Sequence, residues 1–361
     1  MQISSPPPAA SMQVLPTLVT GVDWGSDAKK RWLACAVLQD DHRYLALPPE
    51  PAGKPDTLIG RLWNRSGEAG LVLIGFDFPI GLPRQYAHKC AVEDFLPLLP
   101  ELGSGAWRDF YKPAETPHSI RIRRPFYPQR PGGARQAHLT QALEVNSIND
   151  LRRICEQAYP GRRAAASLFW TLGGQQVGKA AIIGWRDVLA PALVQTRIPF
   201  FIWPFSGSLV QTLHPGRVVA AEVYPAEFYA HLNIRFPAPA GASERTNIRP
   251  NTGRGKRTQA VRQANAPILL AWARRARVRL SPQLEEAIRS GFGPRAQAED
   301  PFDAVIALFG ILNVLLGFQA PEAEQIPPEI SSAIHRVEGW ILGQQGLPGV
   351  LLGIGRTQGV P

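Results

Sequence analysis

Three apolar runs in this sequence each lead into one acidic residue and break within three residues after it. The runs and their acids are residues 18–22 with Asp23, 71–76 with Asp77, and 218–221 with Glu222. Short apolar runs of this kind are typical of buried strands. If the strands lie parallel in one sheet, their carboxylates meet beyond the strands' carboxyl ends, where open α/β sheets bind ligands. The spacing therefore predicts an acidic site at one edge of a sheet.

A fourth acid, Asp303, lies at the start of a nearly all-apolar helix predicted over residues 300–317. A helix this apolar is buried, so an acid in its first turn lies at the rim of the core. Capping of the helix is the plain alternative for Asp303, and the favoured role for Asp300. Carboxylates a few ångström apart cannot all stay ionised without a cation, and Mg²⁺ or Mn²⁺ prefers such oxygen ligands. A divalent metal ion is the simplest compensation.

The four acids lie in four motifs whose order is informative. In chain order the motifs are Gly-Val-Asp-x-Gly-Ser, Ile-Gly-Phe-Asp-Phe-Pro-Ile-Gly-Leu, Ala-Glu-Val-Tyr-Pro and Glu-Asp-Pro-Phe-Asp-Ala. This order resembles the family known as domain of unknown function 429, which are predicted RNase H-like nucleases, and more distantly the RuvC-type resolvases. The resemblance implies a site of Asp23, Asp77, Glu222 and Asp303 that binds Mg²⁺ or Mn²⁺. Glu222 either ligates the metal or positions a neighbouring base or lysine.

The same resemblance implies the fold, an RNase H-like mixed sheet of five strands flanked by helices. Strands 1 to 3 would be antiparallel, and strands 1, 4 and 5 parallel. The expected organisation is a disordered lead-in over residues 1–16 and an RNase H-like domain over 17–317. A large, mostly helical insertion is expected over 84–216, with helices at 143–159 and 180–193. A tail over 318–361 packs on the domain or trails from it.

Composition limits the partners and the compartment. The chain has 361 residues, a formal charge of +10 and a pI near 9.9, which favours a polyanion such as nucleic acid. No apolar run reaches the roughly 18–20 residues that span a bilayer, and the amino terminus does not resemble a signal peptide. Three cysteines without a Cys-x-x-Cys pattern argue against a disulfide framework or a zinc site. We therefore expect a cytoplasmic protein without a membrane partner.

Basic residues that could bind the phosphates of a nucleic acid gather in two segments. Aromatic residues lie among those of the first segment, and a flexible loop accompanies those of the second. The residues expected to bind nucleic acid are Arg121, Arg123, Arg124, Arg130, Arg254 and Arg257. A further candidate, Lys256, follows a loop predicted to be mobile over residues 237–255. Because Lys256 lies between the Glu222 strand and the Asp303 helix, it could reach the acidic site and take part in catalysis.

These features favour a metal-dependent nuclease that hydrolyses phosphodiester bonds of nucleic acid. An alternative is a non-catalytic RNase H-like module that only binds nucleic acid. A third possibility, an actin-like kinase or ATPase, would need a second Asp-x-Gly phosphate hairpin, which the sequence lacks. Residues 173–180 match the Gly-x4-Gly-Lys spacing of a phosphate loop, but Ala180 stands where the metal-binding Ser or Thr would be. A glycine turn at the start of a helix is the simpler interpretation.

Overall fold

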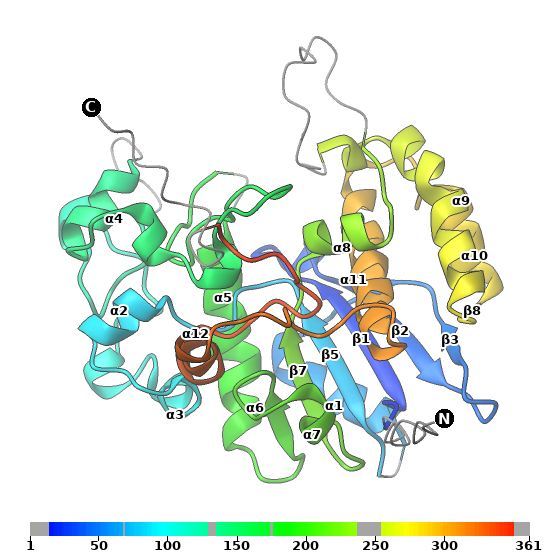
Figure 1. Cartoon of the computed structure of the whole chain (residues 1–361), viewed down its shortest axis with the longest axis horizontal. Coiled ribbons are helices and arrows are strands. Elements are labelled where there is room, and N and C mark those ends of the chain that lie inside the picture. Colours follow the sequence, from blue (N-terminus) through cyan, green and yellow to red (C-terminus); the bar gives the residue numbers. More distant parts are fainter. Residues whose placement is uncertain (1–13, 68, 129–134, 174–175, 237–253, 350–361) are drawn as a thin grey trace, which may run out of the picture.

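Over the residues that the structure describes, eight strands form one sheet with helices on both faces (Figure 1). The structure is a computed structural model, and it describes residues 14–67, 69–128, 135–173, 176–236 and 254–349. The strands are β1 (Leu18–Asp23), β2 (Trp32–Leu38), β3 (Tyr44–Ala46), β4 (Glu50–Pro51), β5 (Val72–Phe76), β6 (Phe200–Ile202), β7 (Val218–Glu222) and β8 (Arg279–Leu280). Their order is β6-β7-β5-β1-β2-β3-β8, and β4 pairs with β2.

The sheet mixes antiparallel and parallel pairs. β2 runs antiparallel to β1 and to β3, whereas β1, β5, β7 and β6 pair in parallel. The mixed α/β class expected from the sequence is therefore confirmed. The predicted number of five strands is too low, because β4, β6 and β8 have only two or three residues each. Strands this short carry no readable alternation of apolar and polar residues.

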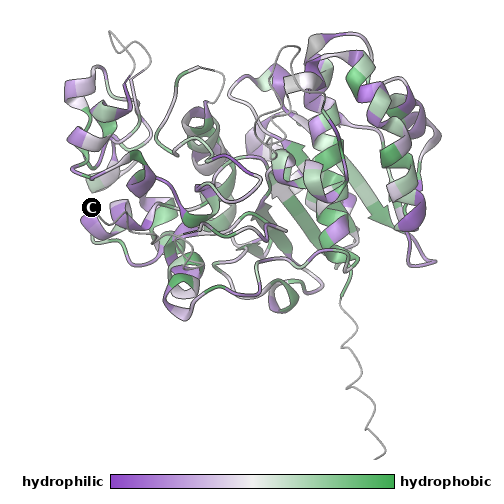
Figure 2. Cartoon of the chain, turned by 45° about the horizontal axis from the view of Figure 1, so that its top comes forward, coloured by the Kyte–Doolittle hydropathy of each residue, from purple (hydrophilic) through white to green (hydrophobic). Residues whose placement is uncertain are grey.

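Helices cover the two faces of the sheet, and the sheet separates the hydrophobic core into two halves. Their bounds are α1 (Pro55–Arg65), α2 (Arg84–Lys89), α3 (Phe95–Leu98), α4 (Gln136–Ala142), α5 (Val177–Gly184), α6 (Ala190–Val194), α7 (Leu209–Thr212), α8 (Pro225–His231), α9 (Gln259–Arg275), α10 (Pro282–Arg289), α11 (Glu299–Leu315) and α12 (Pro328–Ala333). α11, with α8, α9 and α10, builds the core on one face, while α1, α5 and α6 lie in the core on the other. The strands between them are strongly apolar (Figure 2).

α11 lies unusually close to β1. An added Cβ on Gly21 would come within 2.3 Å of the backbone nitrogen of Leu308, so only glycine fits there. β1 and β5 present their small residues, Gly21 and Gly75, to α11, and this close approach brings the first turn of α11 next to the ends of both strands. Asp303, which follows in the second turn of α11, is thereby carried to the sheet's carboxyl edge.

The segment between β5 and β7 is built mainly from short helices and turns. The long helix predicted at 143–159 is wrong, because the structure has two 3-10 helices there, Ile148–Leu151 and Ile154–Glu156. The side chain of Asp150 accepts a hydrogen bond from the backbone N–H of Ser147 (2.9 Å), and local bonds of this kind compete with a helix. This segment also supplies β6, which extends the sheet beyond β7.

Residues after α11 return to the sheet. Ile341 forms a parallel bridge with Glu222, and its neighbour Leu342 donates its backbone N–H to the carbonyl of Glu222 at 2.9 Å. Trp340, beside them, is fully buried. The described part of the C-terminal segment therefore packs on the end of β7, close to the edge where the acids lie.

Candidate functional site

Asp23, Asp77 and Asp303 come together at the carboxyl edge of the sheet, on the face that α11 covers. Side chains alternate along a strand, so Asp23 follows the face of Gly21, and Asp77 follows that of Gly75. Asp77 stays in the sheet's hydrogen-bond ladder, because its backbone N–H donates to the carbonyl of Val22 at 3.0 Å. The three distant acids thus lie near enough to influence one another, as predicted, but the described residues contain no group of three such side chains that could hold one metal ion.

Burial and the charge of Asp303 destabilise the charged forms of Asp23 and Asp77. Burial, followed by the negative charge of Asp303, raises the pKa of Asp77 to about 8. Burial, then Asp303 and then Asp77, holds the pKa of Asp23 well above its usual range. The side chains of Asp23 and Asp77 are both partly buried. Within the described residues, neither of them takes part in a hydrogen bond. These two carboxylates therefore retain free ligand capacity.

Asp303, in contrast, already has partners on both oxygens. The Tyr229 hydroxyl donates to Oδ1 at 2.6 Å, and the Lys256 ammonium contacts Oδ2 directly. Burial lowers the pKa of Lys256, but Asp303, Tyr229 and Asp23 raise it more, so the net pKa lies well above the usual value. Lys256 is thus a fixed positive charge inside the acidic cluster, which agrees with its predicted reach into the site.

Glu222 lies in the same part of the sheet but faces the other way. It shares its strand face with Ala220, which belongs to the core opposite α11. Arg153 donates to both carboxylate oxygens of Glu222, each at 2.6 Å, and the backbone N–H of Ile80 donates to one of them at 2.7 Å. The sequence led us to expect Glu222 in one group with the three aspartates. The structure instead pairs Glu222 with Arg153, on the other face of the sheet.

Arg153 is a residue that the sequence did not single out. It is fully buried, and besides Glu222 it bonds the side chain of Glu156 and the backbone carbonyls of Ile80 and Glu338. These contacts join the insertion, the turn after Asp77 and the C-terminal segment. Because its partners are distant in sequence, no local pattern could have marked it.

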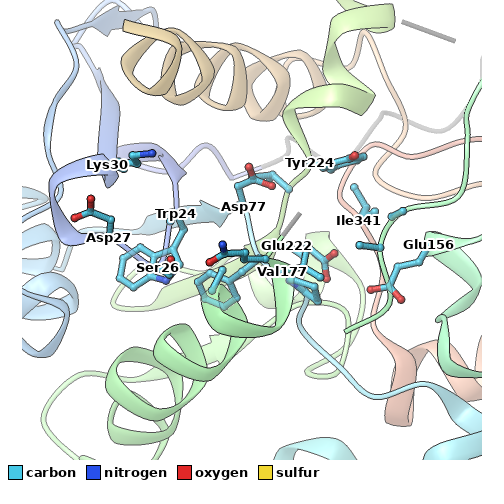
Figure 3. A pocket seen from close by; sticks show the side chains of 18 of the residues that line it. Trp24, Ser26, Asp27, Lys30, Asp77, Glu156, Val177, Glu222, Tyr224 and Ile341 are labelled. Carbon is cyan, nitrogen blue, oxygen red and sulfur yellow. The ribbon is translucent and has the colours of Figure 1, made fainter. Parts of the chain in front are cut away.

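A cleft of about 550 Å³ opens beside the acids. Its walls come from the ends of β1, β5 and β7, from α5, and from the C-terminal segment (Figure 3). Asp77 lines this cleft, whereas Asp23 and Asp303 are not among its lining residues. The other lining residues with polar side chains include Ser26, Asp27, Lys30, Glu156, Gln176, Glu222, Tyr224, Arg257 and Glu299. A cavity of this volume lies within the roughly 300–1,000 Å³ typical of small-ligand sites. It can accept a small ligand beside Asp77.

The arginines expected to bind nucleic acid do not gather in one place. Arg257 is exposed and lines the cleft, where it pairs with Glu299 at 3.4 Å. Arg121 and Arg123 are exposed elsewhere, and Arg124 pairs with Glu115 at 3.3 Å. Arg130 lies outside the described residues, as does most of the 237–255 loop, and only the backbone of Arg254 is described. A continuous basic track is thus not visible in the part of the chain that the structure describes.

The segment with phosphate-loop spacing lines the cleft but lacks the frame of a phosphate loop. Gly173, Gln176 and Ala180 belong to the cleft wall, and α5 begins at Val177. The described residues 167–172 before it form turns, not the strand that a phosphate loop would follow. The simpler expectation, a glycine turn leading into a helix, agrees with this geometry.

Several features bear on metal and membrane partners. In the described part of the chain, no three His, Cys, Asp or Glu side chains form a group ready to hold a metal ion. Cys35, Cys90 and Cys155 are unpaired. Among the described residues, no helix is long and apolar enough to cross a bilayer.

Comparison with protein-family models, curated proteins and solved structures yields no match.

The raised pKa of Asp77 predicts an unusual pH dependence for the metal-free protein. The pKa rises from about 3.9 in the unfolded chain to about 8 in the folded one. The folded state binds this proton more tightly, so the stability it contributes is lost as pH rises through that interval. In EDTA, we expect the free energy of unfolding, measured by urea denaturation, to fall between about pH 5 and pH 8. Asp77→Asn should flatten this decline, and an unchanged slope would contradict the assigned pKa.

Proposed function

We propose that this chain is a metal-dependent nuclease with an RNase H-like fold. The order β3-β2-β1-β5-β7, with the first three strands antiparallel and the last three parallel, supports that fold. The observation that carries the function is the convergence of Asp23, Asp77 and Asp303 at one sheet edge, beside a cleft. Carboxylates at this edge suit phosphodiester hydrolysis because they could hold a divalent cation, which would stabilise the negative charge that develops on the phosphate.

The donor set fits Mg²⁺ or Mn²⁺, although it is smaller than the four acids expected from the sequence. Mg²⁺ is commonly held by one or two carboxylates, with water and substrate phosphate completing its shell. Asp23 and Asp77 have unpaired oxygens for this purpose, whereas Arg153 occupies Glu222. A cation bound there would lower the pKa of an attacking water and stabilise charge on the phosphate. In this proposal Glu222 is therefore not a metal ligand. It instead positions Arg153 and the turn after Asp77.

The other residues of the site have separate roles in this proposal. Lys256 supplies a permanent positive charge next to the reacting phosphate, and Tyr229 orients Asp303 from the side of the core. Lys30 and Arg257, at the rim of the cleft, attract a polyanion, in agreement with the formal charge of +10. The substrate class is nucleic acid, with RNA and DNA both open.

The direct test is cleavage of a panel of single-stranded, duplex, hybrid and branched RNA and DNA. We expect hydrolysis of at least one substrate with Mg²⁺ or Mn²⁺ and none with EDTA. A folded protein that cleaves nothing and releases no heat on titration with Mn²⁺ would contradict the proposal.

A second candidate is a nucleic-acid-binding module without turnover. The contact between Lys256 and Asp303 favours it, because an internal ammonium already neutralises one carboxylate. Binding would then survive EDTA and weaken steeply with salt, as release of counterions from the phosphates requires. Fluorescence anisotropy with labelled oligonucleotides at increasing NaCl, with and without EDTA, separates the two functions.

A further inference from the structure

The contacts of Asp303 set it apart from the other two aspartates. Both of its oxygens are engaged, one by the Tyr229 hydroxyl and one by the Lys256 ammonium, and its side chain is almost fully buried. A metal ion at Asp303 would have to share an oxygen that already accepts a hydrogen bond, and at Oδ2 it would meet the Lys256 ammonium. Asp23 and Asp77 face no such competition from the described residues.

Lys256 is held in this position and is not a surface side chain that happens to fold inward. The guanidinium of the buried Arg262 donates to the backbone carbonyl of Lys256. The same guanidinium donates to the carbonyls of Gly291 and Gly293, at 2.8 and 2.7 Å. The loop end that carries Lys256 is thereby tied to the turn after α10, so its ammonium is directed at Asp303.

The charges of the cluster point the same way. The Lys256 ammonium contacts Asp303 directly and so adds one positive charge to the group of three aspartates. Three carboxylates and one ammonium leave two negative charges when ionised, and one divalent cation balances them. Two divalent cations would leave an excess of positive charge in a partly buried site.

We propose that the site takes one divalent cation, held by Asp23 and Asp77, and that the Lys256 ammonium replaces a second cation beside Asp303. This inference rests on the proposed function. It makes Asp303 a positioning residue for Lys256 and not a metal ligand. Two-metal sites place their cations about 3.5–4 Å apart, one for the attacking and one for the leaving oxygen. Here the ammonium would carry the second of these roles.

The test counts Mn²⁺ ions bound per chain, by isothermal titration calorimetry and by the EPR signal of free Mn²⁺. We expect one ion for the full-length wild type. Lys256→Met should allow a second ion, because Asp303 then has a free oxygen. Lys54→Met, which removes an exposed lysine at the start of α1, is the matched control and should still bind one.

A second set of variants tests the ligand assignment without touching Lys256. Asp303→Asn should weaken Mn²⁺ binding within the about 10- to 100-fold that loss of an outer-shell partner costs. Asp23→Asn and Asp77→Asn should each weaken it more than that. Circular dichroism of every variant shows whether it is folded. If Lys256→Met does not fold, the Mn²⁺ affinity of Asp303→Asn still shows whether Asp303 is a metal ligand.

The outcomes are distinct. Two Mn²⁺ ions in the wild type, one ion in folded Lys256→Met, or an Asp303→Asn defect as large as that of Asp23→Asn would overturn the one-cation site and leave the nuclease proposal standing. No bound Mn²⁺ in the wild type would remove the metal-dependent function itself, and the single-cation site with it.

Discussion

Asp23→Asn is expected to abolish metal-dependent cleavage and to leave the metal-free protein at least as stable as the wild type. The substitution keeps the shape of the side chain but removes one charge from a ligand. Turnover should fall by more than the about 100-fold upper range for loss of an outer-shell partner. In EDTA the melting temperature should stay equal or rise, because repulsion from Asp303 and Asp77 is relieved.

A purely structural role for Asp23 makes the opposite prediction. Loss of a turn or cap costs about 0.5–2 kcal/mol and has no specific effect on metal binding. Thermal melts with and without Mn²⁺ separate the two roles. Asp56→Asn, an exposed acid in the first turn of α1, is the control and should keep the stabilisation by Mn²⁺. A wild-type rise in melting temperature on adding Mn²⁺ to Asp23→Asn would refute the assignment as a ligand.

Arg153→Met should cause the largest loss of stability. Arg153 is fully buried, and its removal leaves Glu222 and Glu156, which are 4% and 2% exposed, without their cation. Breaking a buried ion pair from one side costs about 3–5 kcal/mol. Burial raises the pKa of Glu222 and Arg153 opposes this, so without Arg153 the carboxyl takes up a proton more readily. The loss should therefore be smaller at low pH.

Urea denaturation of two further variants shows whether burial is the cause. Arg186 and Asp187 form an ion pair at 2.6 Å, the same distance as between Arg153 and Glu222, but their side chains are 52% and 33% exposed. Arg186→Met should cost no more than about 1 kcal/mol. Adding Glu222→Gln to Arg153→Met should recover part of the loss. Equal effects of Arg153→Met and Arg186→Met would mean that the buried pair contributes little.

The sequence predicted which segments meet but not how the side chains of one of them are directed. β1, β5, β7 and α11 begin and end close to their expected positions, because long apolar runs that end on an acid leave little choice. Glu222 was expected beside Asp77, yet it points to the other face. A shift of one residue relative to the neighbouring strand reverses every side chain, and the register between β5 and β7 cannot be read from composition.

The partners of the acids were harder to predict than the acids. Lys256 could be proposed from its place between two site elements, since the chain had to pass the cleft there. Arg153 could not, because it lies in a stretch that favours a helix by its composition but forms 3-10 turns. The role of Arg153 depends on its hydrogen bonds to Glu222 and Glu338, which lie 69 and 185 residues away. Only the folded chain shows such a contact.

The junction at Arg153 also bears on the order in which the molecule can fold. Glu338 accepts hydrogen bonds from the backbone N–H groups of Arg84 and Ile154, which precede it by 254 and 184 residues. Closing loops of this length is slow, and contacts of high sequence separation form late in folding. The sheet can assemble from residues 18–222, but the turn after Asp77 gains its last partners only when Glu338 arrives. We therefore expect the acidic edge to be completed last, after the sheet that carries it.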